Sequence, residues 1–174
     1  MLIIVQARMN SSRLPKKVLY QINGKPLLKY LIERLTNIVE GELCIATSDH
    51  TKDDEIEDLC LIEKIPCFRG SLKDVANRIL SAATNYKANT FVRINGDSPL
   101  IDPALVNQAI RIFVNGDYDL VTNVFPRSFP MGQSVEVIRT STFKKAYKKM
   151  SNPDHFEHVT KYYYENHSNY RIRN

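Results

Sequence analysis

The opening residues place the tightest restriction on what this chain can fold into. Residues 2–7 (LIIVQA) form an apolar run that ends at a polar turn. Such a run is typical of a strand that is buried on both faces of a parallel sheet. We therefore expect the chain to begin with a strand that lies in the core of an α/β fold.

The segments after this strand alternate between helix and strand patterns. Apolar residues spaced three and four apart predict helices, and short apolar runs between turn residues predict strands. The predicted helices cover residues 26–39, 51–65, 75–87, 103–115, 140–150 and 153–166, and the predicted strands cover residues 43–47, 66–69, 90–95, 118–124, 135–138 and 170–173. This alternation predicts a three-layer α/β/α domain with a mostly parallel sheet. With 174 residues, we expect a single domain spanning 1–174.

A cluster of cations follows the first strand, and the first acidic residue of the chain is Glu33. The cations are Arg8, Arg13, Lys16, Lys17 and Lys25. In open α/β sheets, ligands bind beyond the carboxyl ends of the strands, so this position favours an anionic ligand such as a polyphosphate. Arg8, Arg13 and Lys17 are the candidate contacts, because Arg offers a planar fork to phosphate oxygens and Lys a mobile charge. A solvated surface loop is the alternative on composition alone.

The net charge of +5 is concentrated near the N-terminus. The first 32 residues hold six of the 24 Lys and Arg residues and none of the 19 Asp and Glu residues. The remaining chain is close to neutral, whereas binding to a nucleic acid duplex usually needs a basic stripe. We therefore expect a small polyanion as the ligand and no nucleic acid partner.

The sequence also indicates where the protein resides. Cys44, Cys60 and Cys67 lack the spacing of metal ligands, which is typical of free thiols in a reducing compartment. The apolar start is too short for a signal peptide, and no later run is long enough to span a bilayer. We expect a cytoplasmic protein that has no membrane partner.

Two common phosphate-binding motifs are absent. Neither GxxxxGK[ST] nor GxGxxG occurs, which excludes an ordinary P-loop NTPase and a dinucleotide-binding dehydrogenase. The best single catalytic candidate is Asp97, which follows the predicted strand 90–95 in a Gly-Asp-Ser-Pro turn. A carboxylate at this edge can hold Mg²⁺, which prefers oxygen ligands and bridges to substrate phosphates. A turn-capping aspartate is the alternative.

Two further groups of polar residues allow more than one interpretation. Ser71 and Asp74 have the spacing of a helix N-terminal box, so they can be caps and nothing else. His155, Glu157 and His158 on a predicted helix suggest a metal site or an acid/base pair. A solvated helix face is favoured, because no third metal ligand is evident.

Five segments together resemble one known family. They are IIVQARMNSSRLPKKVL, FRGSLKDVANR, VRINGDSPLIDP, PMGQSVEV and EHVT, and they follow in the same order from Ile3 to about Tyr170. The chain resembles the cytidylyltransferases of the acylneuraminate and deoxy-octulosonate type, and most closely their spore-coat polysaccharide biosynthesis branch. The resemblance implies a nucleotide-diphospho-sugar transferase fold, which is Rossmann-like. It also implies Mg²⁺-dependent transfer of CMP from CTP to an acidic or related sugar, with release of pyrophosphate, in the biosynthesis of a surface polysaccharide or glycan.

The resemblance assigns roles to individual residues. It places the nucleotide at Gln6 and Ala7, with its triphosphate at Arg8, Arg13 and Lys17, and Mg²⁺ at Asp97. It places the base near Arg69, Ser71 and Asp74. It places the sugar at Glu136, His158 and Thr160.

Members of this family normally continue to a D-[TS]-x-E-D-like segment that adds a second acidic group near the metal. No such segment occurs before Asn174. We therefore expect a form that lacks the family's C-terminal segment, which binds CTP but turns over slowly or not at all. The alternative function is a non-catalytic protein that binds a nucleotide or a sugar phosphate, and pyrophosphate release distinguishes the two. A homodimer is a possible assembly.

Overall fold

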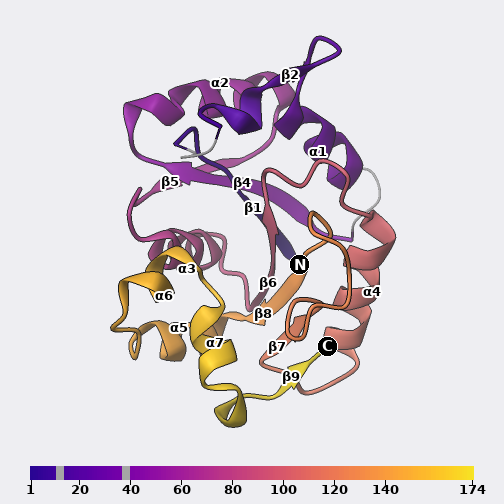
Figure 1. The fold of residues 1–174 in the computed structure, drawn as a ribbon, viewed down its shortest axis with the longest axis vertical. Coiled ribbons are helices and arrows are strands. Elements are labelled where there is room, and N and C mark those ends of the chain that lie inside the picture. The colour runs from indigo at the N-terminus through magenta and orange to yellow at the C-terminus, as the bar shows by residue number, and fades with distance from the viewer. Residues whose placement is uncertain (11–13, 37–39) are drawn as a thin grey trace.

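A computed structural model describes residues 1–10, 14–36 and 40–174. These residues form a sheet with the strand order β5-β4-β1-β6-β8-β7-β9 (Figure 1). The strands are β1 (Leu2–Gln6), β4 (Glu42–Ser48), β5 (Cys67–Gly70), β6 (Thr90–Asn95), β7 (Leu120–Thr122), β8 (Glu136–Arg139) and β9 (Ile172–Arg173). Only β8 runs antiparallel to its neighbours in this described sheet. The prediction of a mostly parallel sheet is confirmed.

The first strand lies where the strand order reverses. β1 pairs in parallel with β4 on one side and with β6 on the other. From β1 the chain builds outward through β4 to β5, and it then returns to place β6 on the opposite side of β1. A crevice opens beyond the carboxyl ends of the strands at such a reversal. The residues that follow β1 and β6 therefore come together at one edge of the sheet.

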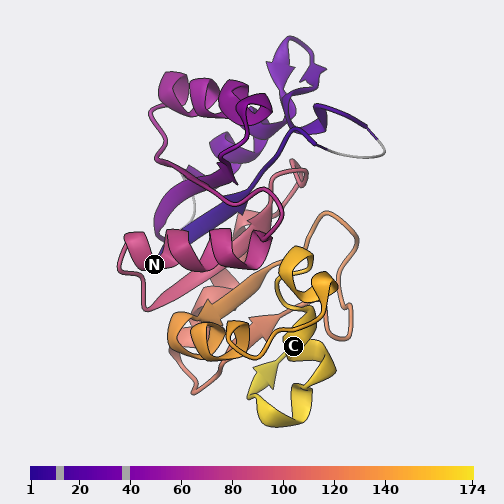
Figure 2. The same ribbon diagram turned by 90° about the vertical axis from the view of Figure 1, so that its left-hand side faces the viewer.

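Helices cover both faces of the sheet (Figures 1 and 2). One face packs against α1 (Leu27–Thr36), α2 (Asp54–Glu63) and α4 (Pro103–Val114). The other packs against α3 (Val75–Asn85), α5 (Thr140–Tyr147), α6 (Pro153–Glu157) and α7 (Lys161–Glu165). Within β1, Ile3 and Val5 face the first layer of helices while Leu2 and Ile4 face the second, and all four are buried. The opening run is thus buried on both faces, as predicted.

A short hairpin follows the first strand where the sequence predicted an irregular loop. It consists of β2 (Gln21–Ile22) and β3 (Lys25–Pro26), which pair in antiparallel fashion. Asn23 and Gly24 between them both have positive φ angles, of 49° and 73°. An Asn-Gly pair favours this two-residue turn, so the hairpin has a recognisable signal in the sequence. The helix predicted for 26–39 begins one residue later, at Leu27, because Pro26 belongs to the hairpin, and residues 37–39 lie outside the described part of the chain.

The helix predicted for residues 153–166 is divided into α6 and α7. His158 ends α6 with φ −104° and ψ 63°, which is not a helical conformation. The break contains Val159, which is buried against the sheet, and Thr160, whose hydroxyl donates a hydrogen bond to Glu136. β-branched residues are also weak helix formers. The break therefore turns Thr160 toward the sheet. None of the described helices is long and apolar enough to cross a membrane.

A buried aspartate fastens the segment after β1 to the end of β4. Asp53 is 1% exposed and lies in the short 3₁₀ helix Thr51–Asp53. Its Oδ1 accepts a hydrogen bond of 2.7 Å from the amide of Met9, and its Oδ2 accepts one of 3.1 Å from the amide of Ser48. The Ser48 hydroxyl also donates to Oδ2. One carboxylate thus holds the exits of two neighbouring strands together.

We expect Asp53→Ala to lower the free energy of unfolding by about 3 kcal/mol, because it leaves buried donors of Met9 and Ser48 without an acceptor. Asp54→Ala is the matched control: Asp54 is exposed and pairs with Arg69 at the surface, so its loss should change the free energy by less than about 1 kcal/mol. Denaturant unfolding of both variants measures the difference. Equal losses of unfolding free energy in the two variants would show that the hydrogen bonds of Asp53 contribute no more than the surface ion pair of Asp54.

Candidate functional site

A polar cavity lies beyond the carboxyl ends of β1 and β6, and its volume is about 450 Å³. Gly96 allows the two strand exits to approach closely there. Its amide donates a hydrogen bond of 2.8 Å to the carbonyl of Gln6, and a Cβ on Gly96 would lie 2.8 Å from the same oxygen. The cavity is lined by Gln6, Ala7, Arg8, Asn10, Lys17, Val18, Arg93, Asn95, Gly96, Asp97, Glu157 and His158. We call it the β1–β6 cavity.

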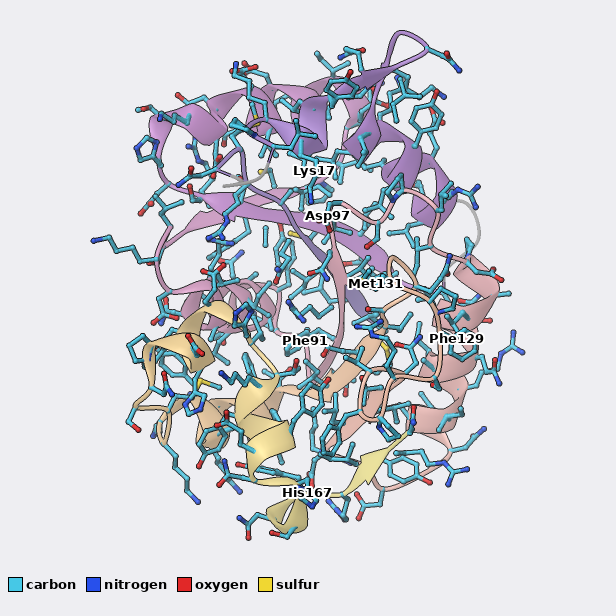
Figure 3. All side chains as sticks on the ribbon, in the orientation of Figure 1. Lys17, Phe91, Asp97, Phe129, Met131 and His167 are labelled. Atoms are coloured by element: carbon cyan, nitrogen blue, oxygen red, sulfur yellow. The ribbon has the colours of Figure 1, made fainter. Side chains whose placement is uncertain are left out.

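Four charged side chains of the β1–β6 cavity form two ion pairs with one another. The Lys17 ammonium forms an ion pair with Asp97 Oδ2, and the two residues lie close together in Figure 3. Arg8 makes a two-pronged contact with Glu157 of α6, in which Nη1 lies 3.1 Å from Oε2 and Nη2 contacts Oε1. All four side chains are about one-third exposed, so these pairs can exchange with a charged ligand at modest cost. The cavity therefore offers two cations, Arg8 and Lys17, and one carboxylate, Asp97, whose present pairs can open.

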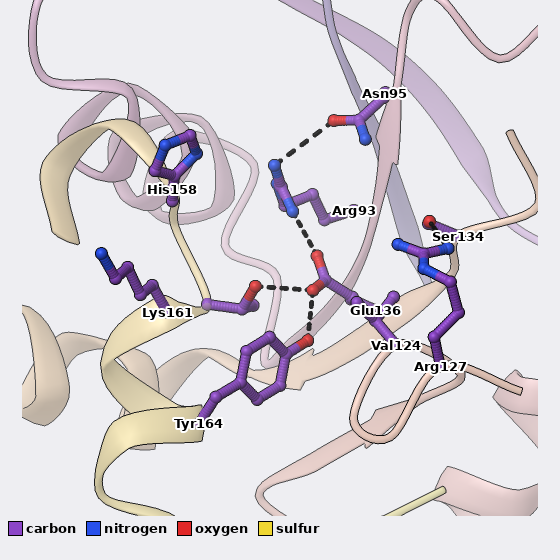
Figure 4. A pocket seen from close by; sticks show the side chains of 10 residues that line it. Arg93, Asn95, Val124, Arg127, Ser134, Glu136, His158, Lys161 and Tyr164 are labelled. Carbon is purple, nitrogen blue, oxygen red and sulfur yellow. Dashed lines mark hydrogen bonds and ion pairs between the residues drawn. The ribbon is translucent and has the colours of Figure 1, made fainter. Parts of the chain in front are cut away.

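A second cavity adjoins the first, with a volume of about 240 Å³ (Figure 4). It is lined by Arg93, Asn95, Val124, Arg127, Ser134, Glu136, His158, Thr160, Lys161 and Tyr164. His158 and Lys161 lie on one side in Figure 4, and Arg127 lies on the other. The Lys161 ammonium forms an ion pair with Asp154 at 2.6 Å. Nη1 of Arg127 donates a hydrogen bond of 3.2 Å to the Ser134 hydroxyl. We call this second space the β6–β8 cavity.

The floor of the β6–β8 cavity is a buried carboxylate. Glu136 is 3% exposed and forms an ion pair with Arg93. It also accepts hydrogen bonds from the hydroxyls of Thr160, at 2.6 Å, and Tyr164, at 2.5 Å. Burial, and then the neighbouring Glu136 carboxylate, raise the pKa of the Tyr164 hydroxyl, which therefore remains a donor at neutral pH. Glu136 is thus a satisfied buried anion that orients its neighbours.

The two cavities share three lining residues, which are Arg93, Asn95 and His158. Arg93 and Asn95 lie two apart on β6 and so project from the same face of that strand. A molecule in one cavity would meet a molecule in the other at these residues. The arrangement can therefore hold two ligands so that they touch.

The predicted triphosphate and sugar residues separate between the two cavities. Gln6, Ala7, Arg8, Lys17 and Asp97 line the β1–β6 cavity, whereas Glu136 and Thr160 line the β6–β8 cavity. His158 lines both. Arg13 lies outside the described residues. The positions agree with the grouping that the resemblance implies, while the ligand contacts themselves stay predictions.

The residues predicted near the base line neither cavity. Arg69 is held by Asp54 and Glu57, each at 2.7 Å, and donates to two backbone carbonyls. Asp74 caps α3 by accepting from the amide of Asn77, and it also accepts a hydrogen bond from the Tyr147 hydroxyl, whose pKa is raised by burial and then by Asp74. The Ser71 hydroxyl accepts from the amide of Asp74. The structure gives Ser71 and Asp74 the capping role, and a contact with a base stays a prediction for all three residues.

The two histidines of the predicted last helix lie in different environments. His155 is buried, and its Nε2 lies 2.7 Å from Glu165, while His158 is exposed at the cavities. Glu157 pairs with Arg8. The described residues contain no group of three or more His, Cys, Asp or Glu side chains that could hold a metal. The burial of His155 is not that of a solvated helix face, whereas His158 is exposed, and a metal or acid/base role for these residues stays a prediction.

Asp97 fits a cation that takes most of its ligands from elsewhere. Its Oδ2 contacts Lys17, and the described residues give its Oδ1 no hydrogen bond. Mg²⁺ is usually held by one or two carboxylates together with water and substrate phosphates. A single carboxylate at the edge of a cavity that is also lined by Arg8 and Lys17 is consistent with that mode of binding.

Several residues of the two cavities were missed by the sequence analysis. They are Asn10, Arg93, Asn95, Arg127, Ser134, Lys161 and Tyr164, together with Glu157 in its role beside Arg8. Arg93 could have been found from the sequence, because it is a cation inside the largely apolar predicted strand TFVRIN. A charge in such a position needs a partner. Asn95 is the last residue of β6, and the others come from loops and short helices whose positions depend on the fold.

Comparison with known proteins agrees with the geometry. A family model described as "Cytidylyltransferase" matches residues 2–173. The spore coat polysaccharide biosynthesis protein SpsF of Bacillus subtilis is 32% identical over 180 residues, which cover 99% of this chain and 73% of that protein. The solved structure of a cytidylyltransferase from Leptospira borgpetersenii superposes with a TM-score of 0.94 at 31% identity, covering 98% of this chain and 73% of the other.

A more distant solved structure shares the fold. It is a CMP:2-keto-3-deoxy-manno-octonic acid synthetase in complex with CTP, with a TM-score of 0.73 and 18% identity over 99% of this chain and 87% of that one. The family match spans nearly the whole sequence and includes every strand that builds the two cavities. This chain therefore belongs to the cytidylyltransferase family.

Proposed function

We propose that this protein transfers CMP from CTP to an acidic or related sugar and releases pyrophosphate. The observation that carries the proposal is the pair of adjoining cavities that share Arg93, Asn95 and His158 at the carboxyl edge of the sheet. A transfer between two substrates needs two spaces that meet at one point, because the reacting atoms must come within contact distance. The β1–β6 cavity would hold the nucleotide and the β6–β8 cavity the sugar.

Arg8 and Lys17 would bind the triphosphate. Each now pairs with a carboxylate, so triphosphate binding would exchange Glu157 and Asp97 for phosphate oxygens. Arg offers two parallel N–H donors to a phosphate, and Lys17 can follow the β- and γ-phosphates as pyrophosphate leaves. Release of Asp97 from Lys17 would free a carboxylate at the moment when the phosphates arrive.

Asp97 would hold Mg²⁺, which would offset negative charge on the phosphates when it is bound. The chain's own contribution is to keep one carboxylate at the end of β6, fixed by the approach of Gly96 to Gln6. Lys17 keeps that carboxylate paired until the ligand binds.

The β6–β8 cavity is suited to a sugar that carries a negative charge. Arg127, Lys161 and His158 line it, whereas its one carboxylate, Glu136, is already occupied by Arg93, Thr160 and Tyr164. Ser134 adds a hydroxyl that could pair with a sugar hydroxyl. The lining therefore favours an anionic and hydroxylated acceptor.

Pyrophosphate release tests the proposal. The protein is incubated with Mg²⁺ and each of the four ribonucleoside triphosphates, with and without a panel of acidic and neutral sugars. The proposal expects release that depends on CTP and on an acidic sugar together. Binding of CTP without release for any sugar would favour a non-catalytic nucleotide-binding protein.

Asp97→Asn should lower kcat/KM for CTP by at least about 100-fold, because loss of the carboxylate charge removes the proposed Mg²⁺ ligand and so about 3 kcal/mol of stabilisation. The control is Asp102→Asn on the same loop, since Asp102 caps α4 and lines neither cavity. Pyrophosphate release at saturating Mg²⁺ measures both variants. Wild-type rates for Asp97→Asn would return Asp97 to a turn residue.

Glu157→Gln should tighten CTP binding about three- to fivefold, because Arg8 would no longer have to leave a charged partner that is worth less than about 1 kcal/mol. Glu33→Gln is the control for net charge, since Glu33 pairs with Lys25 away from both cavities. Titration calorimetry with CTP gives the two affinities. Weaker binding by Glu157→Gln would mean that Glu157 positions Arg8 for the phosphates and does not compete with them.

A further inference from the structure

We propose that Arg93 is a catalytic residue that binds the reacting α-phosphoryl group. This assignment rests on the proposed function, and it concerns a residue that lies in the segment VRINGDSPLIDP but to which the sequence analysis gave no role. Arg93 lies on β6, between β1 and β8, and its register partners are Ile4 and Glu136. Its side chain is 12% exposed and lines both cavities.

The guanidinium of Arg93 is held on three sides. Nε donates a hydrogen bond of 2.9 Å to the side-chain oxygen of Gln6. Nη1 contacts Glu136, and Nη2 lies 3.3 Å from the side-chain oxygen of Asn95 (Figure 4). A guanidinium has five N–H donors, so about two remain, one on each terminal nitrogen. Two N–H groups on one planar fork are what a two-pronged contact with a phosphoryl group requires.

The partners of Arg93 fix its position before any ligand arrives. Glu136 is itself held by Thr160 and Tyr164, and Gln6 is the last residue of β1. The cation is therefore anchored to three strands and to the break between α6 and α7. A donor that does not need to reorganise stabilises developing charge better than a mobile one. Lys17 and Arg8, which must first leave their own carboxylates, do not have this property.

The position of Arg93 indicates which atoms it contacts. The outer phosphates would lie at Arg8, Lys17 and Asp97, and the sugar would lie in the β6–β8 cavity, so the α-phosphorus falls at the junction. There the sugar hydroxyl oxygen forms a bond to the α-phosphorus while the bond from that phosphorus to the oxygen that bridges to the β-phosphate breaks. Pyrophosphate leaves with that electron pair, and the hydroxyl proton passes to water. Negative charge spreads over the equatorial oxygens of the α-phosphoryl group during this step, and the free N–H groups of Arg93 stabilise it.

The test is Arg93→Lys, which keeps the charge and removes the fork. We expect kcat for pyrophosphate release to fall about 100-fold, while the Kd for CTP changes by less than about threefold. Arg139→Lys is the matched control, because Arg139 lies on the neighbouring strand β8 and bonds to Asp117 and Tyr118 outside both cavities. It should keep wild-type kcat. A kcat for Arg93→Lys within threefold of wild type would overturn the assignment.

A second comparison controls for misfolding, because a change to one residue of a buried ion pair leaves the charge of the other unpaired. In the double variant Arg93→Met with Glu136→Gln both charges are absent, and it is compared with Glu136→Gln alone. The assignment expects circular dichroism to show that both variants are folded. It also expects kcat of the double variant to be about 100-fold below that of Glu136→Gln alone. Equal rates for the two would place the effect at Glu136 and overturn the assignment.

The phosphorus resonances of bound CTP separate this assignment from the proposed function. Arg93→Lys should move the α-phosphorus resonance of bound CTP and leave the β and γ resonances in place, even if the wild-type protein releases no pyrophosphate with any sugar. In that case the proposed transfer would be wrong while the contact with the α-phosphate held. An unchanged α resonance would overturn the assignment whatever the rate of turnover.

Discussion

The parallel pairing of β1 with both β4 and β6 is the constraint on which the site depends. It places the exits of β1 and β6 side by side, and Gly96 lets them approach to a hydrogen bond of 2.8 Å. Asp53 then fastens the segment after β1 to the end of β4. Because both exits are fixed, Lys17 and Asp97 meet although 80 positions separate them in the sequence. The chemistry of the site thus follows from the strand order.

Charge pairing divides the site into parts that differ in mobility. The Arg93–Glu136 pair is buried and supported by Gln6, Thr160 and Tyr164, so its geometry is fixed. The Lys17–Asp97 and Arg8–Glu157 pairs are partly exposed and can open. Under the proposed function, a rigid centre lies at the junction of the two cavities, and the flanking charges would exchange partners when ligands bind. Burial decides which charges belong to which part, since water screens the exposed pairs and not the buried one.

Periodicity and turn residues were enough to predict most of the fold. The run at residues 2–7 gave the buried strand β1, and the alternation of patterns gave the mostly parallel sheet. The Asn-Gly pair at residues 23–24 signalled a hairpin that the sequence analysis overlooked. The division of the last predicted helix at residues 158–160 was hidden, because it depends on Thr160 reaching Glu136 across the fold. The grouping of Arg8, Lys17 and Asp97 could be anticipated, since all follow strands at the same edge of the sheet. The pairing of Arg8 with Glu157, 149 positions away, could not, because it depends on how α6 packs.

The central claim is that the two adjoining cavities hold a nucleotide and a sugar that meet at Arg93. A crystal structure of this protein soaked with CTP and Mg²⁺ tests it most directly. The account predicts density for the triphosphate among Arg8, Lys17 and Asp97, with the α-phosphate beside Arg93 and the β6–β8 cavity left open. Triphosphate bound outside the β1–β6 cavity, or bound with its γ-phosphate at Arg93, would contradict it.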